Sequence, residues 1–377
     1  MNTCSNPQWR DAWAGLLFIV NLCGLLIAPH LFLECDWGVS TLGYHSIATL
    51  QNFISGIASH LVLGGILVLL LFFLTDIAIH VCAFVVGYFV IHPCFLVVGH
   101  LVLKSDALSF THQAVDAATV ALALIVIILF NEHLTETCRI LRAQKVVLKR
   151  IPVVWVWIST MLTGLLLMCL SPTPKDVSTF ADCFFIYQGL GLLWLVLVAA
   201  AVGQSIVASA AIMELDDAEM DGVLLLAAKQ SLTTSFGSLC IAAVASPVKL
   251  LIGKPDSHAY TKMALANMSY SEASADAPQS ELARHQVISL LVVALLSSLI
   301  PEVAASSLLF GGGFHTWPIY SFKVFGPLLA AKIWLEGASG AILLKWEGNK
   351  AYMLQKFPQI GPLAKHPAEA SEPPQRV

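Results

Sequence analysis

Long uninterrupted runs of apolar residues, separated by shorter polar stretches, dominate the chain. A helix needs about 20 consecutive apolar residues to cross the hydrocarbon core of a bilayer. The apolar residues follow one another without the alternation of a membrane β-strand, which favours helices. The runs predict nine membrane helices, at Ala12–Leu33, Gly56–Thr75, Ile77–Val102, Ala114–Asn131, Pro152–Leu170, Cys183–Ser209, Val223–Ile252, Val287–Leu309 and Ile319–Leu344.

The composition supports this interpretation. Hydrophobic residues make up 57% of the 377 residues and charged residues only 12%, whereas a soluble domain carries about 25% charged residues. A core of ordinary size has no room to hide so much apolar surface from water, so lipid is the expected solvent. We therefore predict an all-α fold, a polytopic transmembrane helical bundle of about nine membrane helices (range eight to ten), over residues 1–345.

The connections between the apolar runs differ in character. Residues 132–150 form the most basic loop, and its apolar positions predict an amphipathic helix on the membrane surface. Residues 253–281 are typical of a polar loop, and residues 346–377 of a polar, partly disordered tail. Because basic loops stay cytoplasmic, residues 132–150 place the N-terminus inside. Nine helices would put the lysine-bearing tail outside, so either one helix is miscounted or the tail breaks this rule.

Several classes of function are disfavoured. The net charge of −4 argues against nucleic acid as a partner. The nine cysteines are scattered without a CxxC pair and predict no metal site. The chain has no phosphate-binding loop, HExxH or GxSxG motif, so we predict neither an enzyme nor a bound cofactor. The expected partner is the lipid bilayer, with the plasma membrane favoured over an organelle membrane, and protein partners stay open.

Ionisable groups inside the predicted helices are candidates for proton coupling, because a charge within lipid is energetically unfavourable. His92 lies in the third predicted helix, where an imidazole suits a proton relay. The competing interpretation is that His92 bonds a backbone carbonyl freed by Pro93. Glu302 follows Pro301 in the eighth predicted helix and would attract a cation or carry a proton, unless it ends a shorter helix.

The most polar stretch inside any predicted helix is residues 229–238. Its small and hydroxylated residues would either line a substrate path or let helices pack closely and bond across their interface. Gln204 and Ser205 of the preceding predicted helix are positioned to face this stretch. We select four of these polar residues as substrate-binding candidates, namely Gln204, Gln230, Thr234 and Ser238.

A permeant organic cation would bind against aromatic faces through cation–π attraction. Trp194 lies deep in its predicted helix and Phe236 stands inside the polar stretch, so both are candidates for such a site. Trp155 and Trp157 lie near the start of a predicted helix and fit an interfacial aromatic belt instead. Packing between helices is the competing interpretation for Trp194.

Two segments carry a resemblance to a known family. Trp9-Arg10-Asp11-Ala12-Trp13 resembles a Trp-x-Asp-x-Trp pattern before a first membrane helix, and Phe236-Gly237-Ser238-Leu239 resembles a Phe-Gly-Ser-Leu signature. Both patterns belong to choline transporter-like proteins, especially fungal and protist members. The resemblance implies a ten-helix carrier of choline or a related amine, with both termini cytoplasmic and exchange against protons. The chain departs from that pattern by lacking a final helix after Trp346.

These observations lead to a hypothesis of function. We expect a secondary membrane transporter of a small organic cation, similar to choline or ethanolamine, with proton coupling as an option. The alternative is a non-transporting membrane scaffold or regulatory subunit with a transporter-like fold. An intramembrane enzyme acting on lipid headgroups is a third hypothesis, which would need acid, base or metal ligands clustered at one depth. Substrate identity, transport direction and coupling ion stay open.

Overall fold

The computed structural model describes residues 11–32, 108–132, 179–216, 223–251, 259–266, 268–275, 333–346 and 348–358, with separate positions between 58 and 95 and between 134 and 145. These residues form α-helices and the turns that join them, and no strand occurs among them. The predicted all-α fold is confirmed for this part of the chain. The predicted helices Pro152–Leu170 and Val287–Leu309, and Glu302 with the latter, lie outside the described residues.

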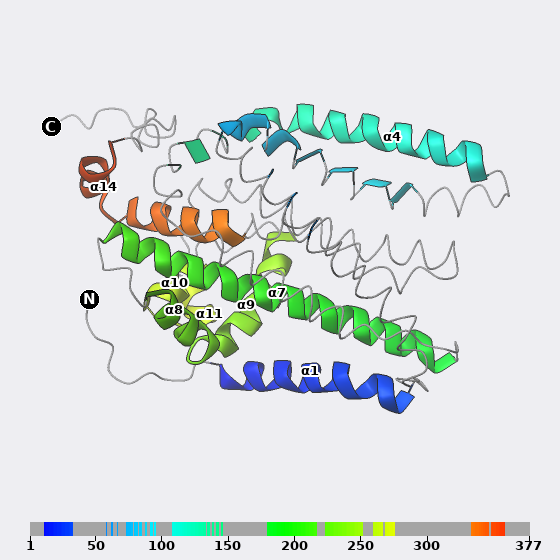
Figure 1. Ribbon diagram of the computed structural model, residues 1–377, viewed down its shortest axis with the longest axis horizontal. Helices are drawn as coiled ribbons and strands as arrows, with labels where there is room; N and C mark the ends of the chain where they lie inside the picture. Colours follow the sequence, from blue (N-terminus) through cyan, green and yellow to red (C-terminus); the bar gives the residue numbers. More distant parts are fainter. Residues whose placement is uncertain are drawn as a thin grey trace.

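Three long helices set the shape of the molecule, namely α1 (Ala12–Phe32), α4 (Leu108–Leu129) and α7 (Thr179–Leu215). Figure 1 shows α1 and α4 on opposite sides of α7. With its 37 residues, α7 is about 55 Å long at about 1.5 Å per residue. Its stretch Leu190–Leu215 is the one helix among the described residues that is long and apolar enough to cross a membrane.

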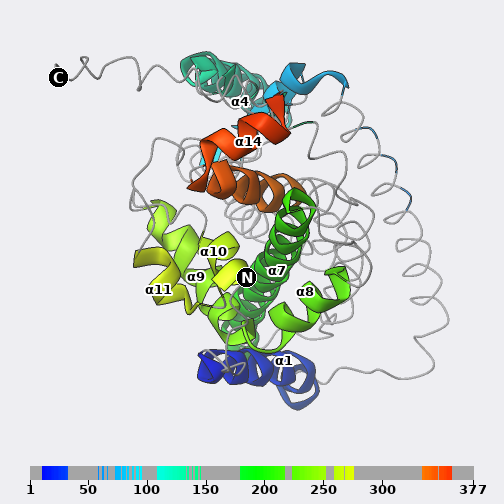
Figure 2. The same cartoon turned by 90° about the vertical axis from the view of Figure 1, so that its left-hand side faces the viewer.

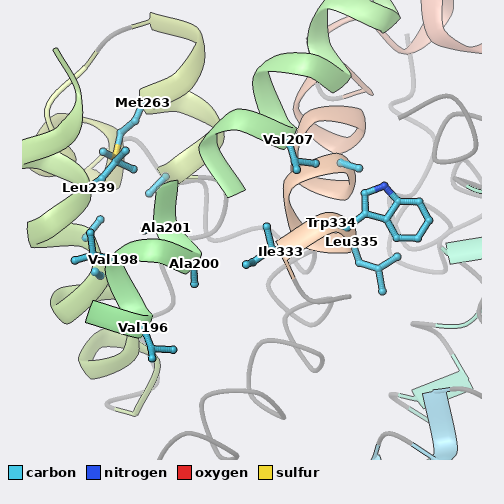
Figure 3. Packing of buried hydrophobic residues seen from close by; sticks show 14 of the residues in the cluster. Val196, Val198, Ala200, Ala201, Val207, Leu239, Met263, Ile333, Trp334 and Leu335 are labelled. Carbon is cyan, nitrogen blue, oxygen red and sulfur yellow. The ribbon is translucent and has the colours of Figure 1, made fainter. Parts of the chain in front are cut away.

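The hydrophobic core is centred on α7. A helix that is apolar on all sides is expected to be buried, and Figure 2 shows α7 in the middle of the other helices. Figure 3 shows buried α7 side chains between Leu239 and Met263 on one side and Ile333, Trp334 and Leu335 on the other. The α7 residues in that view are Val196, Val198, Ala200, Ala201 and Val207.

α1 packs antiparallel along α7. The Phe18 and Trp194 rings meet edge to face, with their centroids 5.3 Å apart. Further along α1, the Asn21 side-chain amide donates to the Gly191 carbonyl over 3.4 Å. The Tyr187 hydroxyl donates to the Asn21 carbonyl over 3.3 Å. Rising numbers on α1 therefore meet falling numbers on α7, and α1 begins toward the C-terminal half of α7.

The helical segment 333–346 packs on the side of α7 opposite α1 (Figures 1 and 2). Two glycines allow a close crossing. A Cβ atom on Gly203 would lie 2.8 Å from Ile333 Cγ2, and one on Gly337 would lie 2.8 Å from the Gln204 carbonyl oxygen. Small residues at a helix crossing permit such approach of the two backbones.

The predicted helix Val223–Ile252 is broken into α8 (Val223–Leu232) and α9 (Phe236–Leu251). The Gln230 carbonyl accepts hydrogen bonds from the Thr233 and Ser235 amides, over 3.3 and 3.1 Å. The Thr234 hydroxyl donates to the same carbonyl over 3.3 Å. Ser and Thr hydroxyls offer the backbone alternatives to regular helical bonds. The hydroxyl-rich sequence thus explains the turn at residues 233–235.

Part of the predicted polar loop 253–281 is helical and belongs to the core. It forms α10 (Ala259–Ala266) and α11 (Tyr270–Ala275), and Met263 and Tyr270 are buried. The Ser269 amide donates to Glu272 Oε2 over 2.9 Å, and the Glu272 amide donates back to the Ser269 hydroxyl over 3.4 Å. This reciprocal pair is a capping box, which starts α11.

A second group of contacts joins α4 to helical positions between 75 and 95. His80 Nε2 lies 3.3 Å from the Asn131 side-chain oxygen, and His92 Nε2 lies 3.0 Å from Asp116 Oδ1. Residue numbers rise on one helix as they fall on the other, so the two helices are antiparallel. The Arg142 guanidinium extends this pairing by donating to Asp76.

α4 continues as a helix into the basic segment 132–150. The Phe130 amide donates to the Val126 carbonyl and the Leu134 amide to the Phe130 carbonyl, each over 3.0 Å. Leu134, Cys138 and Leu141 follow at helical spacing and are buried in the hydrophobic core. The apolar face of the predicted amphipathic helix therefore packs inside the protein at these positions, rather than on a membrane surface.

The predicted polar tail begins with an ordered helix, α14 (Lys350–Lys356). The Asn349 side chain caps it by accepting from the Tyr352 amide over 3.0 Å. The Tyr352 hydroxyl donates to the Leu215 carbonyl over 3.3 Å. α14 therefore lies at the C-terminal end of α7.

Candidate functional site

Two consecutive turns of α7 carry buried polar residues within an otherwise apolar stretch of helix. Gln204, Ser205 and Ser209 are all buried. The Ser209 hydroxyl donates to the Ser205 carbonyl over 3.0 Å, which satisfies it within the helix. The side chains of Gln204 and Ser205 instead reach other helices, because buried polar groups need partners.

Gln204 meets a carboxylate. Its side-chain amide donates to Glu336 Oε2, on the helical segment 333–346. The close crossing of the two backbones at Gly337 holds the two side chains together. An amide–carboxylate bond in a weakly polar core is stronger than the same bond in water, because the local dielectric constant is lower.

Ser205 meets the broken helix. The Ser231 hydroxyl of α8 donates to the Ser205 hydroxyl over 3.1 Å, and both groups are buried. The neighbouring Gln230 side chain donates to the Ala264 carbonyl of α10 over 3.5 Å. Thr234 bonds the Gln230 carbonyl and so stabilises the turn itself. The predicted polar stretch therefore connects three helices.

On the other side of the turn, the start of α9 meets the start of α1. The buried Ser238 hydroxyl donates to Asp11 Oδ2 over 2.6 Å. Asp11 has a left-handed backbone, with φ of 51°, a conformation that Asp tolerates better than most residues. A Cβ on Gly15 would lie 3.6 Å from Gly237 Cα, so the two helices are in close contact here.

These contacts form separate pairs, one at the start of α1 and α9 and others around Gln204 and Ser205, and we group them under the name polar layer. We use this name for Asp11, Gln204, Ser205, Gln230, Ser231, Ser238 and Glu336. It contains two carboxylates, and its other members are neutral amides and hydroxyls. Such a group of oxygens within an apolar bundle favours a cation or a proton over an anion. Among the described residues, no group of acidic, histidine and cysteine side chains is arranged to hold a metal ion.

The two aromatic candidates both contact Phe18, and Trp194 lies away from Gln204 along α7. The Phe18 ring packs edge to face against both Trp194 and Phe236, at centroid distances of 5.3 and 5.7 Å. The Trp194 indole donates to the Cys240 carbonyl over 3.3 Å. Trp194 is ten residues from Gln204 along α7, which corresponds to a rise of about 15 Å. Both candidate rings therefore pack against Phe18.

His92 belongs to a separate cluster. It lies 3.0 Å from Asp116, which also accepts from the Tyr88 hydroxyl over 3.2 Å. The His92 and Tyr88 rings are stacked, with centroids 5.3 Å apart. The competing interpretation, a bond from His92 to a carbonyl freed by Pro93, stays open, because Pro93 lies outside the described residues. The structure does not bring His92 to the polar layer.

Sequence reasoning selected Gln204, Gln230 and Ser238 but missed Asp11 and Glu336. Glu336 lies inside the predicted helix Ile319–Leu344, so the criterion applied to Glu302 (a carboxylate within an apolar run) would have found it. Asp11 precedes its predicted helix and gave no such signal. Its partner Ser238 is 227 positions away in the sequence.

Comparisons with known proteins add no identification. No protein-family model matches this chain, and no curated protein matches it. The resemblance to choline transporter-like proteins therefore rests on the quoted segments alone and stays a prediction.

Proposed function

We propose that this chain is a multi-pass membrane carrier for a small organic cation of the choline or ethanolamine kind. Exposed apolar side chains support a lipid environment. On α1, Leu16 is 63% exposed, and on α4, Leu129 is 73% exposed. Such faces are rarely left in water. The long apolar stretch Leu190–Leu215 and the shorter ones in α1, α4 and α9 point the same way.

One observation carries the choice of a cation carrier, namely the pairing of Glu336 with Gln204 inside the polar layer. A carboxylate in an apolar bundle would be unfavourable without a functional partner. The neighbouring residue Ser205 bonds Ser231 of the broken helix α8–α9, and this matters as well. Discontinuous helices are a recurring place for substrate and ion binding in secondary transporters.

In this proposal Glu336 exchanges its hydrogen bond to Gln204 for the arriving cation or for a proton. The Ser205 and Ser231 hydroxyls stabilise the positively charged headgroup through their oxygen atoms. Asp11 supplies a second carboxylate on the α1 side of the layer. Proton exchange at Glu336 would couple the cation to a proton gradient, and the His92–Asp116 pair is a second candidate for proton binding.

The experiment is uptake of labelled choline and ethanolamine by vesicles that contain the purified protein. We expect saturable uptake that responds to a proton gradient. Glu336→Gln should lower it by about tenfold or more, because a hydrogen bond to a charged group is worth about 1.5–3 kcal/mol. Glu132→Gln, which changes an exposed carboxylate on the continuation of α4, is the control. No saturable flux of either compound under any proton gradient would contradict the proposal.

A non-transporting scaffold with a transporter-like fold is the second candidate, and one observation favours it. The Phe18 ring packs edge to face against both Trp194 and Phe236, so these rings have a packing role. In that case choline would not raise the melting temperature of the purified protein, and a stable partner would co-purify. A rise in melting temperature with choline would speak against the scaffold.

A further inference from the structure

The C-terminal helix α14 buries two side chains at the end of α7. Met353 and Phe357 are 0% and 3% exposed. They form a small hydrophobic cluster with Leu215 of α7 and with Ile342 and Trp346 of the helical segment 333–346. This cluster is separate from the main core. α14 therefore packs against the C-terminal ends of α7 and of the helical segment 333–346.

Charged groups strengthen the same junction. Lys345 contacts both oxygens of Asp216, each over 2.7 Å. The Lys356 ammonium donates to the Leu215 carbonyl over 2.5 Å, and the Tyr352 hydroxyl donates to that carbonyl as well. The last carbonyls of a helix carry a partial negative charge, so a lysine there is stabilising. The end of α7 is thus capped by α14 and joined to the segment 333–346.

The two joined helices are those that bear the amide–carboxylate pair of the polar layer. Lys345 follows Glu336 by nine residues, a rise of about 14 Å, and Leu215 follows Gln204 by eleven, a rise of about 17 Å. The helices are therefore in contact at the Gly337 crossing and again at the junction. Two contacts along rigid helices fix their angle, whereas one contact leaves them free to pivot.

We propose that α14 is a latch, holding the segment 333–346 against the end of α7 and thereby keeping Glu336 bonded to Gln204. Undocking α14 takes Met353, Phe357 and Lys356 out of the second contact and so weakens it, although the Lys345–Asp216 ion pair does not depend on α14. The two helices then pivot more freely at Gly337, and the pair separates more readily. A change in transport on undocking of α14 rests on the proposed cation-carrier function of the polar layer. The docking of α14 itself does not rest on that function, because it concerns only how the helices are held together.

Hydrogen–deuterium exchange on the full-length protein in lipid nanodiscs tests the latch. In the double variant Met353→Ala, Phe357→Ala, exchange should become about tenfold faster or more in residues 205–216 and 333–346, and stay unchanged in α4. Leu354→Ala is the matched control, because Leu354 lies on the same helix but is 37% exposed. Unchanged exchange in 333–346, or an equal rise in α4, would overturn the latch.

A milder variant tests the latch if the double variant does not fold. Lys356→Gln removes the charge at the end of α7, and Lys350→Gln at the exposed start of α14 is its control. Faster exchange in 333–346 for Lys356→Gln alone supports the latch, and equal exchange for the two variants contradicts it.

Uptake by the same variants tests the regulatory role. We expect the choline uptake rate of Met353→Ala, Phe357→Ala to differ about fivefold or more from that of Leu354→Ala, because the pair in the polar layer has opened. Faster exchange with an unchanged uptake rate would overturn the regulatory role. If the wild-type protein takes up neither choline nor ethanolamine, the proposed function fails, while the exchange measurement still decides the latch.

Discussion

Cys138 shows how burial changes the chemistry of a single side chain. It lies on the buried face of the helix that continues α4, between Leu134 and Leu141. Burial raises the pKa of the Cys138 thiol to about 11, against a smaller lowering by a backbone hydrogen bond. A thiolate is the reactive form, and a buried thiol surrounded by apolar groups forms it less readily than an exposed one.

We therefore expect maleimide to label Cys138 slowly. At pH 8 its thiolate fraction would be about a hundredfold below that of an ordinary cysteine, and burial limits access further. Mass spectrometry of the labelled protein should show Cys138 unmodified until denaturant is added. Thr135→Cys places a thiol at an exposed position on the same helix and should react quickly. Equal labelling rates at 135 and 138 would show that this face is open.

At the residue scale, sequence reasoning found the polar members of the site that interrupt an apolar run. Gln204, Gln230 and Ser238 are conspicuous for that reason. It placed Ser205 opposite the polar stretch, where Ser205 bonds Ser231. It did not pair Ser238 with Asp11, because that pairing depends on how α1 folds back onto α9. The deep position of Trp194 was also evident from the sequence. That the Phe18 ring would fill the space beside it was not.

At the element scale, hydropathy located the described long helices α1, α4 and α7 but not the interruption between α8 and α9. It identified residues 223–252 as one long apolar run, because averaging gives little weight to Thr233, Thr234 and Ser235. Those side chains and amides bond the Gln230 carbonyl and end α8. The capping box at Ser269 and Glu272 is visible in the sequence as Ser-x-x-Glu, but these residues were predicted as part of the polar loop 253–281.

The crossing of α7 with the segment 333–346 yields a prediction of its own. Gly337→Ala would place a methyl group 2.8 Å from the Gln204 carbonyl oxygen, so the two backbones must move apart. We expect a loss of about 1–3 kcal/mol in the free energy of unfolding, as is usual for overpacking. Thermal unfolding in detergent, monitored by circular dichroism, would measure it.

Gly348→Ala is the matched control, because a Cβ there meets nothing within 4 Å. Its free energy of unfolding should change by no more than about 0.5 kcal/mol. If Gly337→Ala is as stable as Gly348→Ala, the two helices are less tightly crossed than described above.

At the scale of the whole molecule, the helix contacts suggest on which side of the membrane the C-terminal tail lies. α1 begins toward the C-terminal half of α7, and Lys345 pairs with Asp216 at the end of that helix. If the apolar helices cross a bilayer, we predict that the chain returns to the side from which it started, which would need an even number of crossings. Within the predicted range of eight to ten membrane helices, this prediction favours eight or ten over nine, with Lys345 on the same side as the start of α1.

This arrangement predicts that both termini are on the cytoplasmic side, since the basic segment 132–150 assigns the N-terminus there. Epitope tags fused to either end should bind antibody only after the membrane of intact cells is permeabilised. In intact cells, antibody binding to the tag at one terminus of the protein, and not to the tag at the other, would require an odd number of crossings.

The length of α7 has a mechanical consequence. A hydrocarbon core is about 30 Å thick, so about 25 Å of a helix about 55 Å long must project beyond it. A rigid projection of that length is a lever arm. Tilting it by about 10° would carry its tip sideways by about 4 Å, more than the reach of a hydrogen bond. Because Leu190–Leu215 is the stretch long and apolar enough to cross a membrane, the projecting length lies mainly at the Thr179 end of α7, and a small rotation of α7 within the bilayer would be amplified there.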